Sequence, residues 1–332
     1  LGLYLILFGG LIFLVSLIIN SFVKKELKLF FIGTIFSIIF TINGINNGLE
    51  GSTILFFIIG QLILILSISN IVISHSAIIS VNNLMSSIII INIILIYNEQ
   101  LNFNVIDITN IWENPNTFAV SLLSPFFLYY ATTKFKKKTI ISFTRSITII
   151  TSFILIYFTS SRSALITISL GILLVNKPLV NKLSVRQLYF IYLSPVFIPI
   201  IAYIIYISEG GVQFMRNIGL HREVWIKTLE QYHNSDLSYN ISYGLNSVIY
   251  GTNTYGIEYF LYIFVLGYFI YFKKKPLVTR GLILFSILHI HETFESTISS
   301  GSFGLIFLKA ALLIIHNYEQ NQIKNKYHNT NV

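Results

Sequence analysis

Residues 2–43 read GLYLILFGGLIFLVSLIINSFVKKELKLFFIGTIFSIIFTIN, and this stretch decides the fold. Two apolar runs, 2–22 and 29–43, are separated by a short turn that carries three lysines. A helix needs about 20 predominantly apolar residues to cross a bilayer, and the first run has that length. Neither run alternates apolar and polar residues in the manner of an outer-membrane strand. The stretch therefore predicts two membrane-spanning helices joined by a basic turn.

Apolar runs of this kind recur along the whole chain of 332 residues. Charged residues make up 11% of the sequence, against about 25% in ordinary globular domains, and hydrophobic residues make up 54%. A water-soluble fold of this size could not cover its surface with so few charges. We therefore predict an all-α, polytopic membrane helix bundle of about 11 transmembrane helices. The predicted spans are residues 2–22, 29–43, 53–69, 84–97, 117–133, 139–158, 163–176, 188–207, 257–272, 281–296 and 302–316.

Lysine and arginine are distributed unevenly between the two faces of this bundle. Seventeen of the 22 fall in or beside alternate loops on one face, which the positive-inside rule assigns to the cytoplasm. The opposite, exterior face holds Arg162, Arg216, Arg222 and Lys227, and Lys309 lies in the last predicted span. The sequence thus predicts a multi-pass protein with a cytoplasmic C-terminus. Its net charge of +9 reflects this topology, and no nucleic-acid partner is expected.

The predicted topology divides the chain into four parts. Residues 1–207 form the first eight spans, 208–256 a large exterior loop, 257–316 the last three spans, and 317–332 a cytoplasmic tail. The chain begins with Leu1 inside an apolar run, so we interpret it as a fragment that lacks an initiator and one further helix, the twelfth. The sequence contains no cysteine, which excludes disulfides, iron–sulfur clusters and thiolate zinc sites.

Titratable residues are concentrated in the large exterior loop, and the sequence places the candidate site there. Three cations, Arg216, Arg222 and Lys227, lie in this loop, and Arg162 stands at the exterior end of a span among small hydroxyl residues. Arginine presents a planar fork of donors that matches phosphate oxygens. These cations therefore predict a pocket for a diphosphate. A solvated loop face, with an arginine that reaches the lipid headgroups, would give the same pattern.

A second polar group lies near the exterior end of the predicted span at 281–296. It consists of His289, His291, Glu292 and Glu295. Spacings of three and four residues let these side chains meet on one helical face. No metal-ligand spacing is matched closely, so we predict a hydrogen-bonded cluster that stabilises the bundle, and no metal site. The sequence also contains no P-loop, dinucleotide fingerprint, nucleophile elbow or zinc-protease motif.

Five short motifs occur in order along the chain. They are residues 114–119 (NPNTFA), 161–165 (SRSAL), 222–225 (REVW), 242–247 (SYGLNS) and 291–296 (HETFES). In this order and topology, the set resembles the O-antigen ligase and Wzy-type O-antigen polymerase superfamily of bacterial envelope glycan enzymes. The resemblance extends from about residue 84 to the C-terminus, and the earlier spans match in hydropathy only.

The resemblance implies a glycosyltransferase of the bacterial plasma membrane that needs no cofactor and no metal. It would transfer or polymerise an undecaprenyl-diphosphate-linked saccharide onto a glycan acceptor at the exterior leaflet of the lipid bilayer, with a flippase and a chain-length regulator as further partners. Arg162, Arg222 and Arg216 would hold the donor diphosphate. The catalytic residues would be Arg222, His233 and His221. The supporting residues would be Asn116, Trp225, Asn253, Tyr255, His291 and Glu295.

One position departs from the family pattern. The family has a histidine–asparagine pair after the glycine-rich turn, whereas this chain has Thr252 and Asn253 there. The catalytic base is therefore open among His233, His221 and a carboxylate. Four interpretations also stay open: a polymerase, a ligase that acts on a lipid A core or another acceptor, a transporter of lipid-linked glycans, and a non-catalytic scaffold of envelope assembly.

Overall fold

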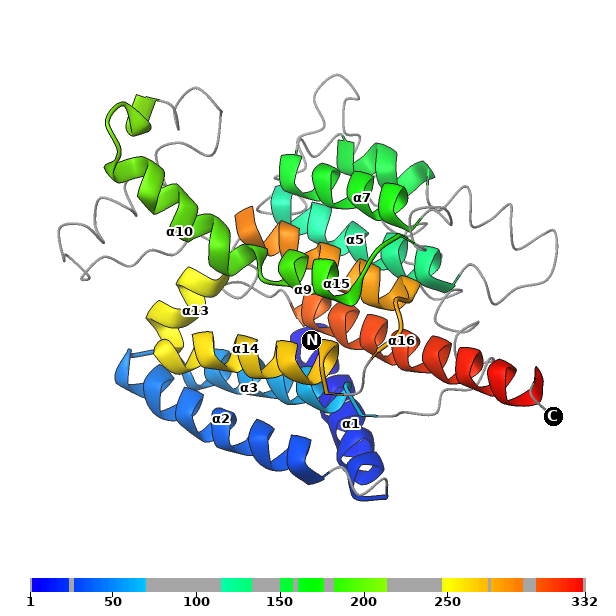
Figure 1. Ribbon diagram of the computed structural model, residues 1–332. Coiled ribbons are helices and arrows are strands. Elements are labelled where there is room, and N and C mark those ends of the chain that lie inside the picture. Colours follow the sequence, from blue (N-terminus) through cyan, green and yellow to red (C-terminus); the bar gives the residue numbers. More distant parts are fainter. Residues whose placement is uncertain are drawn as a thin grey trace, which may run out of the picture.

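A computed structural model describes residues 2–23, 27–69, 115–132, 150–157, 161–175, 182–213, 247–273, 276–294 and 303–330. Within these ranges every regular element is a helix and no strand occurs (Figure 1). The prediction of an all-α fold is confirmed. The helices are α1 (Gly2–Val23), α2 (Leu27–Asn46), α3 (Gly51–Leu66), α5 (Pro115–Ala131), α7 (Arg162–Leu174), α9 (Val185–Tyr192), α10 (Ser194–Ile207), α13 (Ser247–Tyr255), α14 (Ile257–Tyr271), α15 (Arg280–Phe294) and α16 (Phe303–Thr330).

Most of these helices lie where the apolar runs predict them. The bounds of α1, α2, α3, α5, α7, α14 and α15 agree with predicted spans to within a few residues. α13 is an addition, because it occupies the end of the segment expected to be an exterior loop. The predicted span at 84–97, part of the span at 139–158 and residues 214–246 of the loop lie outside the described residues.

The predicted span at 188–207 is not one straight helix. It is divided at Leu193 into α9 and α10, which are bent by 60° relative to each other. Pro195 stands at the start of α10. A proline ring clashes with the carbonyl four residues earlier and supplies no N–H, but it is well tolerated in the first turn of a helix. The chain therefore ends one helix and begins another at this point.

The last helix is longer than the predicted span at 302–316. α16 continues to Thr330, through residues that the sequence assigns to a cytoplasmic tail. The side chain of Asn317 is buried, and its amide donates hydrogen bonds to the carbonyl oxygens of Ser67 and Ser69, just after α3. Carbonyl groups at the end of a helix lack partners within that helix. A tertiary contact thus supports a helical segment that hydropathy does not reveal.

α15 lies at the centre of the bundle. α5, α7, α9, α10, α13 and α16 all pack against it. Six of its apolar side chains are completely buried: Leu282, Ile283, Leu284, Phe285, Ile287 and Leu288. The polar residues His289, His291 and Glu292 follow on the same helix, and they are buried as well. The central place of α15 therefore carries titratable groups into the interior of the protein.

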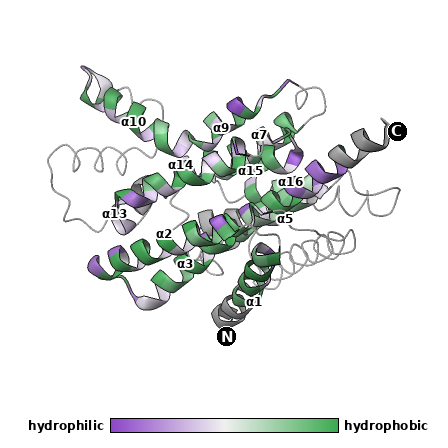
Figure 2. Ribbon diagram, turned by 60° about the horizontal axis from the view of Figure 1, so that its bottom comes forward, coloured by the Kyte–Doolittle hydropathy of each residue, from purple (hydrophilic) through white to green (hydrophobic). Residues whose placement is uncertain are grey.

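Large apolar side chains are exposed on α1, α2 and α10, and much of the ribbon of α1 and α2 has the green of hydrophobic residues in Figure 2. They include Ile12, Ile19, Phe31, Ile35, Ile38, Ile45, Ile200, Ile204 and Ile207. Of the described helices, α2 is long and apolar enough to cross a membrane, and the bent pair α9–α10 would give a second span if it crosses as one unit. Shorter apolar helices are Gly10–Val23, Gly51–Leu66, Ser163–Leu174 and Ile257–Tyr271.

Candidate functional site

The motifs that begin α5 and α7 and the motif at the end of α15 lie at one end of the bundle. The helices approach one another at Gly171 of α7, where an added Cβ would lie 2.6 Å from the ring of Phe127 in α5 and 3.4 Å from Leu284 in α15. α5 and α7 run in one direction and α15 in the opposite direction (Figure 1). The contacting residues Phe127 and Gly171 follow the starts of α5 and α7, and Leu284 precedes the end of α15. Each lies about 9–12 residues from that end of its helix. At about 1.5 Å per residue, all three ends lie about 14–18 Å from the contact, on the same side.

His291, in the motif at the end of α15, lies against the first turn of α7. Its side chain is completely buried, and its ring faces the backbone of Ser163. Within the part of the chain that the structure describes, neither ring nitrogen makes a hydrogen bond of regular geometry. Arg162 is the first residue of α7. The structure therefore places His291, a predicted supporting residue, near Ser163, the residue that follows Arg162.

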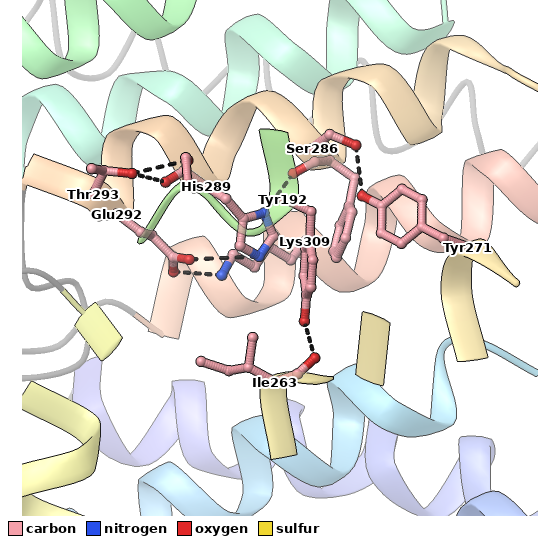
Figure 3. Close-up of polar contacts among 10 residues, drawn as sticks. Tyr192, Ile263, Tyr271, Ser286, His289, Glu292, Thr293 and Lys309 are labelled. Atoms are coloured by element: carbon pink, nitrogen blue, oxygen red, sulfur yellow. Dashed lines mark hydrogen bonds and ion pairs between the residues drawn. The ribbon is translucent and has the colours of Figure 1, made fainter. Parts of the chain in front are cut away.

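Next to His291, three charged or titratable side chains form a buried cluster (Figure 3). Lys309 of α16 donates a hydrogen bond from Nζ to Oε1 of Glu292 on α15. His289 Nε2 lies 3.6 Å from Oε2 of the same carboxylate, and His289 Nδ1 donates to the carbonyl oxygen of Phe285 at 2.9 Å. The predicted pairing of His289 with Glu292 is confirmed. The third member, Lys309, was not predicted as a partner, although a lone cation in an apolar span is a signal that a partner exists.

A cavity of about 30 Å³ adjoins the buried cluster. This is room for about two or three water molecules, since a water needs about 10–15 Å³ on this measure. Its lining includes Gln61 of α3, Tyr192 of α9, Val248 of α13, Tyr259 of α14, Glu292 and Lys309. The sequence did not mark Gln61, Tyr192 or Tyr259 as site residues, because only the packing of distant helices brings them together.

The bend between α9 and α10 opens on this cavity. Pro195 and Val196, in the first turn of α10, belong to its lining. Directly before them, the hydroxyl of Ser194 lies within hydrogen-bond distance of the hydroxyl of Thr293 on α15, at 3.0 Å. The interrupted helix is thus tied to the residue that follows Glu292.

Tyr255, a predicted supporting residue, has a packing role. Its ring is buried and stacks on Phe57 of α3, with 3.8 Å between the ring centroids. Its carbonyl oxygen accepts a hydrogen bond from the side chain of Asn43 at 2.6 Å. Tyr255 is not among the described residues that line the cavity.

The remaining predicted site residues are described in part or not at all. The structure places Asn116 in α5 and Asn253 in α13, but describes neither side chain, and the same holds for Arg162. The residues that lie outside the described ranges are Arg216, His221, Arg222, Trp225, His233 and Glu295. The diphosphate pocket predicted in the exterior loop stays a prediction. In the described part of the chain, no three His, Asp or Glu side chains come together in a way that could hold a metal ion.

No protein-family model matches this chain, and neither does any curated protein or solved structure. The fold and the site define an all-helical protein with titratable groups buried near one end of the bundle. The function must therefore be argued from the motifs and geometry of this chain.

Proposed function

We propose that this protein is a polytopic membrane glycosyltransferase that transfers or polymerises undecaprenyl-diphosphate-linked oligosaccharides at the exterior leaflet. The observation that carries the proposal is the packing of α15, whose last turns carry the buried His291, against α7, which Arg162 begins. These residues belong to two of the five motifs on which the resemblance rests, and they are more than 120 residues apart in the sequence. Their proximity is expected if the motifs build one site.

The exposed apolar surface supports the placement in a membrane. Continuous faces of isoleucine, leucine and phenylalanine on α1, α2 and α10 would be unfavourable in water, but lipid chains solvate them. The buried Glu292–Lys309 pair fits the same environment, because ionisable side chains inside a membrane protein face the interior and pair with one another. The positive-inside rule then orients the starts of α5 and α7 and the end of α15 toward the exterior.

The reaction follows from the chemistry of the donor. The bond between the anomeric carbon of the sugar and the diphosphate oxygen breaks, and a new bond forms to a hydroxyl oxygen of the acceptor. The electron pair leaves with the diphosphate, where Arg162 and Arg222 would stabilise the developing charge. The hydroxyl proton passes to a general base, for which His233, His221 and a carboxylate are the candidates.

Glycan analysis of a deletion strain tests this proposal. For a polymerase, long chains disappear while a single repeat unit is retained. For a ligase, unmodified acceptor is present beside accumulated lipid-linked polymer. An unchanged glycan profile in the deletion strain, with the wild-type gene normally expressed in the parent, would contradict both.

A transporter of lipid-linked glycans is the second candidate, and two observations favour it. The helix formed by α9 and α10 is interrupted, and a charged pair is buried beside the interruption. Discontinuous helices and paired intramembrane charges are common at the substrate sites of transporters. In a deletion strain, a transporter would leave the lipid-linked saccharide on the cytoplasmic leaflet, whereas a transferase would leave it on the exterior leaflet.

A further inference from the structure

His289 and Glu292 turn two hydrogen-bond acceptors toward each other. Nδ1 of His289 lies 2.9 Å from the carbonyl oxygen of Phe285, and because this oxygen can only accept, the proton of the neutral ring is on Nδ1. Nε2 then carries a lone pair, and it lies 3.6 Å from Oε2 of Glu292, a carboxylate oxygen that also only accepts (Figure 3). This distance is too long for a hydrogen bond between the two atoms. They therefore fit a donor that reaches both.

Gln61 and Tyr259 bring further polar groups to the cavity that His289 and Glu292 also line. Both residues are more than nine-tenths buried, with exposed fractions of 6% and 7%. Among the described residues, neither the side-chain amide of Gln61 nor the hydroxyl of Tyr259 makes a hydrogen bond, because the bond that Gln61 accepts from Tyr262 goes to its backbone carbonyl oxygen. Buried polar groups of this kind are usually satisfied by ordered water when no protein group reaches them.

The charges at the cavity favour a neutral ligand. The carboxylate of Glu292 is compensated by the ammonium group of Lys309, which donates a hydrogen bond to it. A metal cation, or a proton on Nε2 of His289, would therefore leave a net positive charge in the interior, and an anion would leave a net negative one. A small neutral molecule that both donates and accepts hydrogen bonds avoids this cost. Water has these properties, and the volume of about 30 Å³ suits it.

We propose that this cavity is a binding site for about two or three ordered water molecules, which hydrate the buried charges inside the helix bundle. One water donates to Nε2 of His289 and to Oε2 of Glu292, and the water molecules also bond to the amide of Gln61 and the hydroxyl of Tyr259. Tyr259 is the third residue of α14 and Glu292 the third from the end of α15. Because the predicted topology places both of these helix ends on the exterior side, water enters from that side. The inference does not depend on glycan transfer.

The proposal fixes the sign of the effect of Tyr259→Phe on stability. Removing a buried hydroxyl that has no partner should raise the melting temperature, whereas removing one that is bonded to water should lower it. We expect the melting temperature of Tyr259→Phe to fall by about 1–4 °C, and that of Gln61→Leu to fall by a similar amount. The matched control is Tyr268→Phe on the same helix, because Tyr268 is 55% exposed. Its melting temperature should not change.

X-ray radiolysis of the purified full chain in phosphatidylcholine nanodiscs detects the water directly. Hydroxyl radicals formed from a bound water oxidise the side chains beside it, and mass spectrometry of the peptides measures the rate at each tyrosine. Tyr259 should be oxidised severalfold faster than Tyr271, a buried tyrosine whose hydroxyl bonds to Ser286 and which is not among the described residues that line the cavity. In Gln61→Leu, which removes a ligand of the water, the rate at Tyr259 should fall toward that of Tyr271.

Three results would overturn the inference. The first is oxidation of Tyr259 that is no faster than that of Tyr271, because the cavity would then be dry. The second is a higher melting temperature of Tyr259→Phe than of the wild type. The third is a fall in the melting temperature when choline chloride replaces sodium chloride at equal ionic strength, in the wild type but not in Gln61→Leu, because the cavity would then hold a sodium ion. None of these measurements involves glycan, so failure of the proposed function leaves the inference in place.

Discussion

Breaking the Glu292–Lys309 pair should destabilise the protein strongly, and the loss of stability should depend on which of the two residues is replaced. Both residues are buried, with exposed fractions of 7% and 6%. Removing one partner of a buried ion pair costs about 3–5 kcal/mol, because the other charge is left uncompensated. In Lys309→Met, His289 at 3.6 Å can take a proton on Nε2 and compensate the carboxylate of Glu292, so the loss should lie near the lower end of this range. In Glu292→Gln, Lys309 loses its carboxylate, so the loss should lie near the upper end.

The double variant Glu292→Gln/Lys309→Met provides the control for this prediction. Replacing both members of a buried pair by well-packed hydrophobic side chains is often neutral or stabilising, and Gln beside Met at least leaves no buried charge without a partner. The double variant should therefore be more stable than either single variant, and the two single effects should not add. The free energy of unfolding is measured by denaturant titration in the same lipid nanodiscs for all four proteins. Equal stability of Lys309→Met and the wild type, or additive losses, would refute a paired buried charge.

Three further predictions follow from the contacts. Asn317→Leu should lower the free energy of unfolding by about 1–3 kcal/mol, because carbonyl groups just after α3 lose a buried donor, as a denaturant titration would detect. Gly171→Ala should lower it by a similar amount through overpacking, whereas Gly51→Ala, where nothing lies within 4 Å, should not. Cysteines placed at Ser235 and Thr133 should respond oppositely to an impermeant thiol reagent, with labelling at Ser235 in intact spheroplasts; labelling at Thr133 alone would reverse the topology.

Hydropathy predicted most of the described helices, because an apolar run long enough to cross a bilayer is a local property of the sequence. It could not predict the bend at Leu193. Pro195 is visible in the sequence, but an apolar run around a proline is equally compatible with a kinked single helix. It also could not predict the helical continuation beyond residue 316, where polar residues such as Asn317 become buried only through contacts with α3. Composition reports the environment of a segment, whereas its partners depend on the tertiary arrangement.

The candidate site was predictable to a similar extent. The pairing of His289 with Glu292 follows from a spacing of three residues on one helix, and the structure confirms it. The pairing of Glu292 with Lys309 depends on α15 and α16 packing together, which no local spacing encodes. His291 was predicted to belong to a hydrogen-bonded cluster that includes Glu295, and among the described residues its ring nitrogens have no hydrogen-bond partner. Only the side-chain packing at the first turn of α7 could reveal this.

Transfer of glycan from a purified lipid-linked donor, at matched protein levels, tests the central claim most directly. Arg162→Lys and Arg222→Lys keep the positive charge but lose the planar fork of donors, so each should lower the rate of transfer by about 10- to 150-fold. If both arginines hold one diphosphate, the combined variant should lose less than the product of the two single effects. Transfer at nearly the wild-type rate by both single variants would contradict the account and leave these arginines as interfacial anchors.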